Sequence, residues 1–217
     1  MAARDPLRNH PAVAASLKFA HILEAARVLE EGRFSEESVC HAFATVGRGL
    51  RVDRLYLAQN VVDDQGRLRF RVRNEWCAEL VEPRGGEAGE GTAYAELGDK
   101  WSEVLGAGEL LSGGPEAFHG QARRLLERHA VRSCLICPIE LPRGRGGAGG
   151  ASWWGLIGLD DCKAQRRWPF DEIVAARTLA RTFSAGIESL ERPTIAEALV
   201  KIGAQRPVRR RHGGRRS

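Results

Sequence analysis

The stretch "WWGLIGLDDCKAQRRWPFDEIVAARTLA", residues 153–180, decides the fold of this chain. Its first half alternates with the period of a β-strand, which predicts Trp154 and Leu156 on one face. Two acids follow, then a short basic turn, a Trp-Pro pair and a long amphipathic helix. This order predicts a strand that ends in acids and a helix that packs back onto it.

The composition predicts a globular protein of ordinary domain size. The chain has 217 residues, of which 43% are hydrophobic, so a real core can form. No apolar run is long enough to span a bilayer, and the first eleven residues lack the apolar segment of a secretory signal. We therefore expect a cytoplasmic protein without membrane contact.

Five cysteines, an odd number, indicate free thiols in a reducing compartment. The only close pair, Cys134 and Cys137, lies in the apolar run "SCLICPIEL". Positions three apart on a strand point to opposite faces, so the pair cannot jointly grip a metal ion. We expect two small buried hydrophobic residues here, and no metal site.

The basic charge is concentrated in the last residues of the chain. Residues 201–217 contain Lys201 and six arginines without an acid: Arg206, Arg209, Arg210, Arg211, Arg215 and Arg216. Subtracting these seven charges from the net charge of +5 leaves −2 on residues 1–200. The tail is predicted to be disordered. Weak contact with nucleic acid or another polyanion, and a merely solubilising role, both remain open.

Periodicity and turn residues predict the elements that precede the last strand. Helical spacing begins near Ser16 and ends at Gly32, and a second helix begins after Ser35, a good N-cap. The remaining expected elements are strands at 54–62 and 67–76 around a "DDQG" turn, helices at 98–105 and 117–131, and strands at 109–112 and 133–141. Hairpin-connected strands with helices at both ends predict an α+β fold, a central antiparallel sheet of five to six strands with helices on both faces.

Arginines share one face of the second strand, at positions 67, 69, 71 and 73. A solvated face on an edge strand and an anion-binding stripe both explain this pattern.

A set of sequence marks in the last third of the chain resembles that of a GAF domain, the small PAS-like sensory module of signalling proteins. The marks are Trp154-Gly155 opening the last strand, "IGLDD" ending it, then Arg166, Trp168 and an acid-rich helix start. The resemblance runs from about residue 16 to residue 190. It divides the chain into a lead-in (1–15), a GAF domain (16–191), a short amphipathic helix (192–204) and a basic tail (205–217).

Within this motif, we expect a structural role for the aromatic and charged side chains. Trp154 is expected to bury its ring in the interior, beside Gly155. Asp160 or Asp161 is expected to pair with Arg166 and pin the turn that Trp168 seals.

The resemblance further implies a small-molecule pocket between one face of the sheet and an irregular roof, residues 78–119. The candidate lining residues are Trp76, Tyr94, Trp101, Phe118 and Leu135. The alternative is that these side chains only fill a closed core. The cofactor is unknown, and covalent bilin is not expected, because Cys77 precedes the roof in which such domains carry the attachment cysteine.

The resemblance implies a non-catalytic module that binds a small molecule or a partner protein in signal transduction. The last helix spaces six residues as a coiled-coil seam, which favours a homodimer through the terminal helices. The seam residues are Ile173, Ala176, Ala180, Phe183, Ile187 and Leu190. Packing of this helix on its own sheet explains the same spacing. An enzymatic alternative is a GAF-type thiol reductase acting on free methionine sulfoxide through Cys77 and Cys134.

Overall fold

The computed structural model describes residues 11–84, 91–142 and 151–191. Its α-helices are α1 (Pro11–Glu31), α2 (Glu36–Leu50), α3 (Tyr94–Leu97), α4 (Asp99–Gly106), α5 (Gly120–Arg128) and α6 (Phe170–Glu191). Its strands are β1 (Arg54–Val62), β2 (Leu68–Cys77), β3 (Thr92–Ala93), β4 (Leu111–Gly113), β5 (Ser133–Pro142) and β6 (Ala151–Asp161). A short 3-10 helix at Pro115–Ala117 precedes α5.

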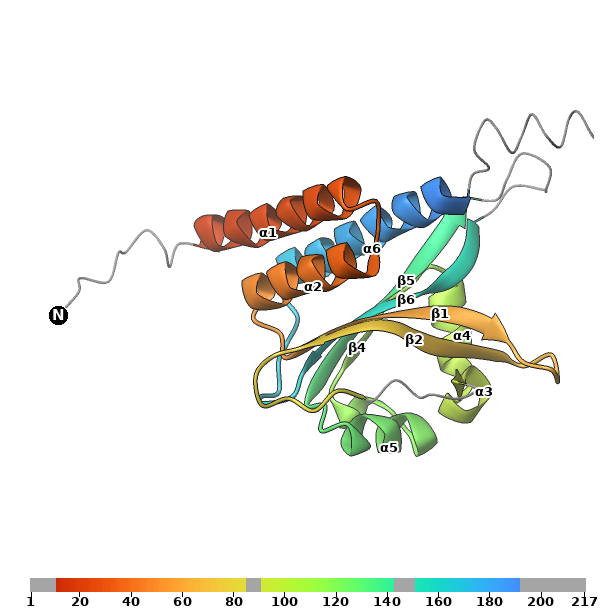
Figure 1. Cartoon of the computed structure of the whole chain (residues 1–217). Coiled ribbons are helices and arrows are strands. Elements are labelled where there is room, and N and C mark those ends of the chain that lie inside the picture. The colour runs from red at the N-terminus through yellow and green to blue at the C-terminus, as the bar shows by residue number, and fades with distance from the viewer. Residues whose placement is uncertain (1–10, 85–90, 143–150, 192–217) are drawn as a thin grey trace, which may run out of the picture.

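These strands form one six-stranded antiparallel sheet in the order β3-β2-β1-β6-β5-β4. Helices α1, α2 and α6 cover one face, while α3, α4 and α5 lie on the other (Figure 1). We call these the helix-layer face and the roof face. The predicted α+β architecture is confirmed.

Alternation along the strands divides the interior into two cores, as a period of two requires. Leu55 and Leu57 of β1 face α1, α2 and α6, whereas Tyr56 and Ala58 belong to the core under the roof. Apolar residues on both faces explain why these strands read as nearly continuous hydrophobic runs.

Two helices begin at other residues than the sequence indicates. Helix α1 begins at Pro11, five residues before the expected start, and proline suits the first turn of a helix. Helix α5 begins at Gly120, because the preceding residues form the 3-10 helix. The N-cap of α2 is as predicted: the Ser35 hydroxyl accepts the Ser38 N–H at 3.3 Å.

Trp154 does not share a face with Leu156. Trp153 packs into the roof core and Trp154 against the helix-layer core, while Leu156 belongs to the roof core. The register of β5 against β6 shifts between Ile139 and Glu140, opposite this point. Such a bulge adds one residue to a strand and reverses the alternation on one side of it.

The expected coiled-coil seam of α6 is engaged within the chain. Ala176, Ala180 and Phe183 are buried in the helix-layer core, and Ile173 and Ile187 pack against it. Leu190 alone among the six is exposed, at 62%. Packing of α6 on its own domain therefore accounts for the spacing. Within the described ranges, no helix is long and apolar enough to cross a membrane.

Strand β2, which carries the arginines, is not an edge strand over its whole length, because β3 pairs with Arg69 and Phe70. Arg69 is buried and pairs with Asp63 at 2.9 Å, and Arg73 donates to the Gln59 side chain. Neighbouring side chains thus bind the guanidinium groups of Arg69 and Arg73.

Candidate ligand site

The residues predicted to line one pocket lie on two faces of the sheet. Tyr94, Trp101 and Phe118 belong to the roof core, but Leu135 is buried in the helix-layer core and Trp76 packs against it. The ring of Trp76 lies so close to α2 that a Cβ on Gly47 would come within 2.0 Å of it. The prediction was wrong for Trp76 and Leu135, since strand parity directs both away from the roof.

The three roof aromatics pack tightly in the interior. The rings of Trp101 and Phe118 lie 5.5 Å apart, and Tyr94 lies 4.7 Å from Trp153 and 5.2 Å from Phe70. The Tyr94 hydroxyl donates to Asn60 at 2.7 Å. These rings therefore fill the roof core around α3 and α4.

Charged side chains gather on the same face at the other end of the strands. The sheet register places Cys77, Arg54, Asp160 and Cys134 in one row across β2, β1, β6 and β5. Asp160 is completely buried and Arg54 is 2% exposed. Arg84, from the irregular segment 78–84, reaches the same place with a side chain that is 6% exposed.

Two arginines share one oxygen of Asp160. Arg54 Nη1 lies 3.1 Å and Arg84 Nη2 lies 2.8 Å from Asp160 Oδ2. The guanidinium of Arg84 also lies over the ring of Tyr56, with its central carbon 4.4 Å from the ring centroid. Arg54 donates further to the backbone carbonyls of His129 and Glu82, and its Nε lies 3.3 Å from Glu75 Oε1.

We call these residues the Asp160 cluster: Arg54, Tyr56, Glu75, Arg84 and Asp160. Hydrogen bonding within the Asp160 cluster is incomplete. Among the described residues, Asp160 Oδ1 and the Nε atoms of Arg54 and Arg84 are buried without a hydrogen-bond partner. Burial lowers the pKa of both arginines, but the attraction of Asp160, together with weaker contributions from neighbouring groups, outweighs burial and leaves each pKa above the ordinary value. Both arginines are therefore charged. An unpaired buried polar atom is costly, so this incompleteness calls for an explanation.

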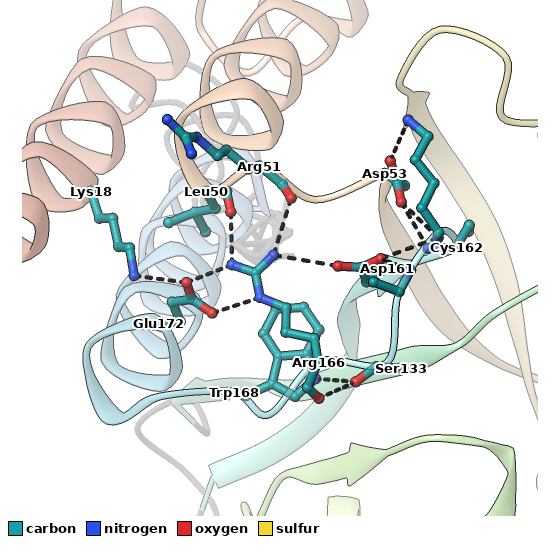
Figure 2. A network of polar contacts seen from close by, with 12 residues as sticks. Lys18, Leu50, Arg51, Asp53, Ser133, Asp161, Cys162, Arg166, Trp168 and Glu172 are labelled. Atoms are coloured by element: carbon teal, nitrogen blue, oxygen red, sulfur yellow. Dashed lines mark hydrogen bonds and ion pairs between the residues drawn. The ribbon is translucent and has the colours of Figure 1, made fainter. Parts of the chain in front are cut away.

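A second network lies at the end of β6, toward the helix layer. Figure 2 shows Arg166 at its centre, between Glu172 and the backbone carbonyls of Leu50 and Arg51. Arg166 Nε donates to Glu172 at 3.0 Å, and Nη2 donates to the Leu50 carbonyl at 2.8 Å. Lys18 of α1 pairs with the other Glu172 oxygen at 2.7 Å. The network therefore joins α1, the end of α2 and the start of α6.

The predicted pair of Arg166 with Asp160 or Asp161 is confirmed for Asp161. Asp161 Oδ2 lies 3.8 Å from Arg166 Nη1, whereas Asp160 pairs with Arg54 and Arg84 on the opposite face. Consecutive strand residues point to opposite faces, so only one of the two acids can reach the helix layer.

Trp168 closes the turn as expected. Its ring lies under the Arg166 guanidinium at 4.8 Å, and its Nε1 donates to Ser133 Oγ at 2.9 Å (Figure 2).

Asp53 fastens the beginning of that turn. Its Oδ2 accepts the backbone N–H groups of Cys162 and Lys163, and Lys163 Nζ lies 2.9 Å from Oδ1. Burial would raise the pKa of Asp53, but the bonds from Lys163 and the Cys162 N–H outweigh it and lower that pKa.

The two cysteines of the reductase alternative are far apart. Cys77 and Cys134 lie on β2 and β5 with β1 and β6 between them, which separates their backbones by roughly 14 Å. A disulfide requires Cα atoms within about 7 Å. Burial raises the pKa of both thiols, most strongly for Cys134, which weakens them as nucleophiles.

In the described part of the chain, no group of three or more His, Cys, Asp or Glu side chains is placed to hold a metal ion. The basic tail and the segment 192–204 lie outside the described residues.

Comparison with solved structures finds the same fold in GAF domains. The phycocyanobilin-bound GAF domain of a cyanobacterial phytochrome superposes with a TM-score of 0.62 at 15% identity, covering 82% of this chain and 98% of that one. A far-red cyanobacteriochrome photoreceptor gives 0.59 at 14% identity, covering 82% and 99%. This chain has the GAF fold. The GAF domain of PixJ from Thermosynechococcus elongatus gives 0.58 at 16% identity, covering 87% and 98%.

One curated relative of this GAF-fold chain is a signalling protein. The methanogenesis regulatory histidine kinase FilI of Methanothrix harundinacea (strain 6Ac) is 26% identical over 153 residues. The match covers 68% of this chain but only 16% of that kinase. No family model matches the sequence.

Sequence reasoning missed most of the Asp160 cluster. In the sequence, Arg54 and Tyr56 belong to the ordinary beginning of a strand. Arg84 is an ordinary arginine in an irregular segment. No local signal could have found them, because only the sheet register brings these residues together. A charged residue opens β1 at the register of Asp160, and Gly158 lies opposite Tyr56. A Cβ on Gly158 would come within 2.0 Å of the Tyr56 ring, so the glycine leaves space for that ring.

Proposed function

We propose that this chain is a non-catalytic sensory module that binds a small molecule on the roof face of its sheet and regulates a signalling partner. The Asp160 cluster carries the proposal. Its buried charges have unused bonding capacity, and perturbed buried charges gather at functional sites more often than elsewhere.

The position of the cluster supports signalling as well as binding. Asp160 is followed directly by Asp161, which contacts the Arg166 network between α1, α2 and α6. A change at the roof face can therefore act on the terminal helices through the end of β6. The relationship to a regulatory histidine kinase agrees with this direction of action.

The phytochrome neighbour is named as phycocyanobilin-bound, but a covalently attached bilin is not part of our proposal for this chain. Residues 78–133 contain no cysteine. The roof aromatics also pack against each other, and Arg84 covers Tyr56, so the interior is filled at both ends.

Protein purified from its own host, studied by native mass spectrometry and absorption spectroscopy, tests the proposal. We expect a bound small molecule or a ligand-dependent rise in melting temperature in a metabolite screen. Turnover of a substrate by the isolated chain would contradict it. So would a coupled methionine sulfoxide reductase activity that is lost in Cys134→Ser.

We further propose a cytoplasmic homodimer through the terminal helices. All five cysteines are free, which suits a reducing compartment. Leu17 and Leu23 of α1 and Leu190 of α6 are exposed, at 50%, 70% and 62%. Sedimentation at micromolar concentration should give a dimer that Leu23→Glu with Leu190→Glu converts to monomer. A wild-type monomer would contradict this.

The basic tail favours a second, weaker activity, binding to nucleic acid or another polyanion. Removal of residues 205–217 should abolish any salt-sensitive DNA binding, because it removes six of the seven positive charges of residues 201–217. Binding that survives the truncation would exclude the tail.

A further inference from the structure

The buried Arg84 side chain comes from a segment with no regular secondary structure. Residues 78–84 form a turn and irregular backbone, and Leu80 in this segment is 97% exposed. Yet the Arg84 guanidinium lies in the interior, bonded to Asp160 and stacked on Tyr56. A peripheral segment therefore delivers a cation to a fully buried carboxylate.

The charges of the cluster balance only while Arg84 is in place. Two arginines, Arg54 and Arg84, face two carboxylates, Glu75 and Asp160. Without the Arg84 side chain, Arg54 alone would face both carboxylates, which leaves one net negative charge in a buried place and is unfavourable. The remaining site would attract a cation, and the face of the Tyr56 ring adds a further preference for positive charge.

The bonding of Arg84 is poorer than a free guanidinium could achieve. Arg84 and Arg54 both donate to Asp160 Oδ2, while Oδ1 and Arg84 Nε have no hydrogen-bond partner within the described residues. A carboxylate and a guanidinium bond best side by side, through two parallel hydrogen bonds. Arg84 does not adopt that arrangement, so Asp160 Oδ1 keeps an unused acceptor position.

The same charges hold the segment 78–84 against the sheet. The Arg84 N–H donates to both carboxylate oxygens of Glu75, at 3.0 and 3.1 Å, and Arg54 Nη2 donates to the Glu82 carbonyl. The Ala78 N–H donates to the Asp53 carbonyl at 2.8 Å. Exchange of Arg84 for another cation would thus reach the segment directly.

We propose that the Asp160 cluster binds a small molecule carrying a guanidinium or amidinium group, which replaces the Arg84 side chain on Asp160 and Tyr56. This inference rests on the proposed sensory function and specifies the ligand class of its site. Arg84 acts as an internal competitor that occupies the site until the ligand arrives.

Titration with methylguanidinium chloride tests the exchange. Saturable shifts of the Tyr56 resonances are expected for the full-length wild-type chain by NMR. Arg84→Gly should bind about tenfold more tightly or better, because removal of the competitor raises the fraction of open sites. Methylurea is similar in shape but uncharged, and it should bind to neither protein. Sodium chloride at equal ionic strength should not shift these resonances.

A matched variant separates the site from general effects. Arg177→Gly removes an arginine whose only described ion pair is the exposed 3.4 Å contact with Glu109, and should leave methylguanidinium affinity at the wild-type value. Asp160→Asn in the Arg84→Gly background should abolish binding. Equal affinity for methylurea, or unchanged affinity in Arg84→Gly, would overturn the proposal.

The wild-type titration remains decisive if Arg84→Gly does not fold. Absence of saturable methylguanidinium binding to the wild-type chain is by itself enough to overturn the proposal. A host-derived ligand without a cationic group would also overturn it while leaving the sensory function intact. The sensory function itself fails only on the substrate turnover described above.

Discussion

Asp160 and Asp161 are neighbours on β6, yet the networks that they enter differ in completeness. Asp161 points toward the helix layer, where it accepts the N–H groups of Lys163 and Ala164 and contacts Arg166. Asp160 points under the roof, where it is fully buried and one of its oxygens lacks a hydrogen-bond partner in the described structure. The first network satisfies its groups and builds the fold, whereas the second retains bonding capacity that a ligand can use.

Replacement of the two acids should separate these roles most clearly. Asp160→Asn leaves Arg54 and Arg84 buried with one carboxylate too few, and should lower the free energy of unfolding by about 3–5 kcal/mol. Asp161→Asn keeps an acceptor for the turn amides and should cost about 1 kcal/mol. Urea denaturation of both variants measures the difference. Equal losses would show that the two networks do not differ in the way described.

Arg166→Ala tests the opposite side of the comparison. The substitution removes donors to Glu172 and to the Leu50 and Arg51 carbonyls, and should lower the free energy of unfolding by about 2–3 kcal/mol. Methylguanidinium affinity should stay close to the wild-type value. A large loss of affinity at unchanged stability would move the ligand site to the Arg166 network.

Arg177→Ala is the control for Arg166→Ala. Arg177 forms an exposed contact with Glu109 at 3.4 Å, and its removal should change stability by less than about 0.5 kcal/mol.

Gly158→Ala probes the floor of the Asp160 cluster. The added methyl group meets the Tyr56 ring, which must shift, so we expect a loss of about 1–3 kcal/mol and weaker methylguanidinium binding. Gly106→Ala is the matched control, because a Cβ there would lie at an ordinary 3.6 Å from Trp153. Helix propensity should make this control neutral or slightly stabilising. Tighter cation binding in Gly158→Ala would contradict the assigned role of Tyr56.

The sequence predicts the elements better than the contacts between them. Period and capping identify Ser35 and the beginning of α2, because these signals are local. The position of Trp154 depends on a bulge, and the surroundings of Trp76 depend on which side of β2 the helix α2 covers. The Asp160 cluster is beyond local reasoning altogether, since Arg54, Arg84 and Asp160 are 30 to 106 positions apart. Short elements such as β3 and α3 leave too little periodicity to be detected.

The smallest expected effect concerns acid and Asp53, whose bonds fasten the turn after β6. A carboxyl whose pKa in the folded chain lies below its unfolded value, about 3.9, stabilises the fold above that value. The contribution is lost as the pH falls through the lowered pKa. Asp53→Asn should therefore be less stable than wild type at pH 7, and the difference should shrink as the pH falls below about 4. Urea denaturation across this range measures it. A difference between the two proteins that is independent of pH would mean that the hydrogen bonds of Asp53, and not its charge, fasten this turn.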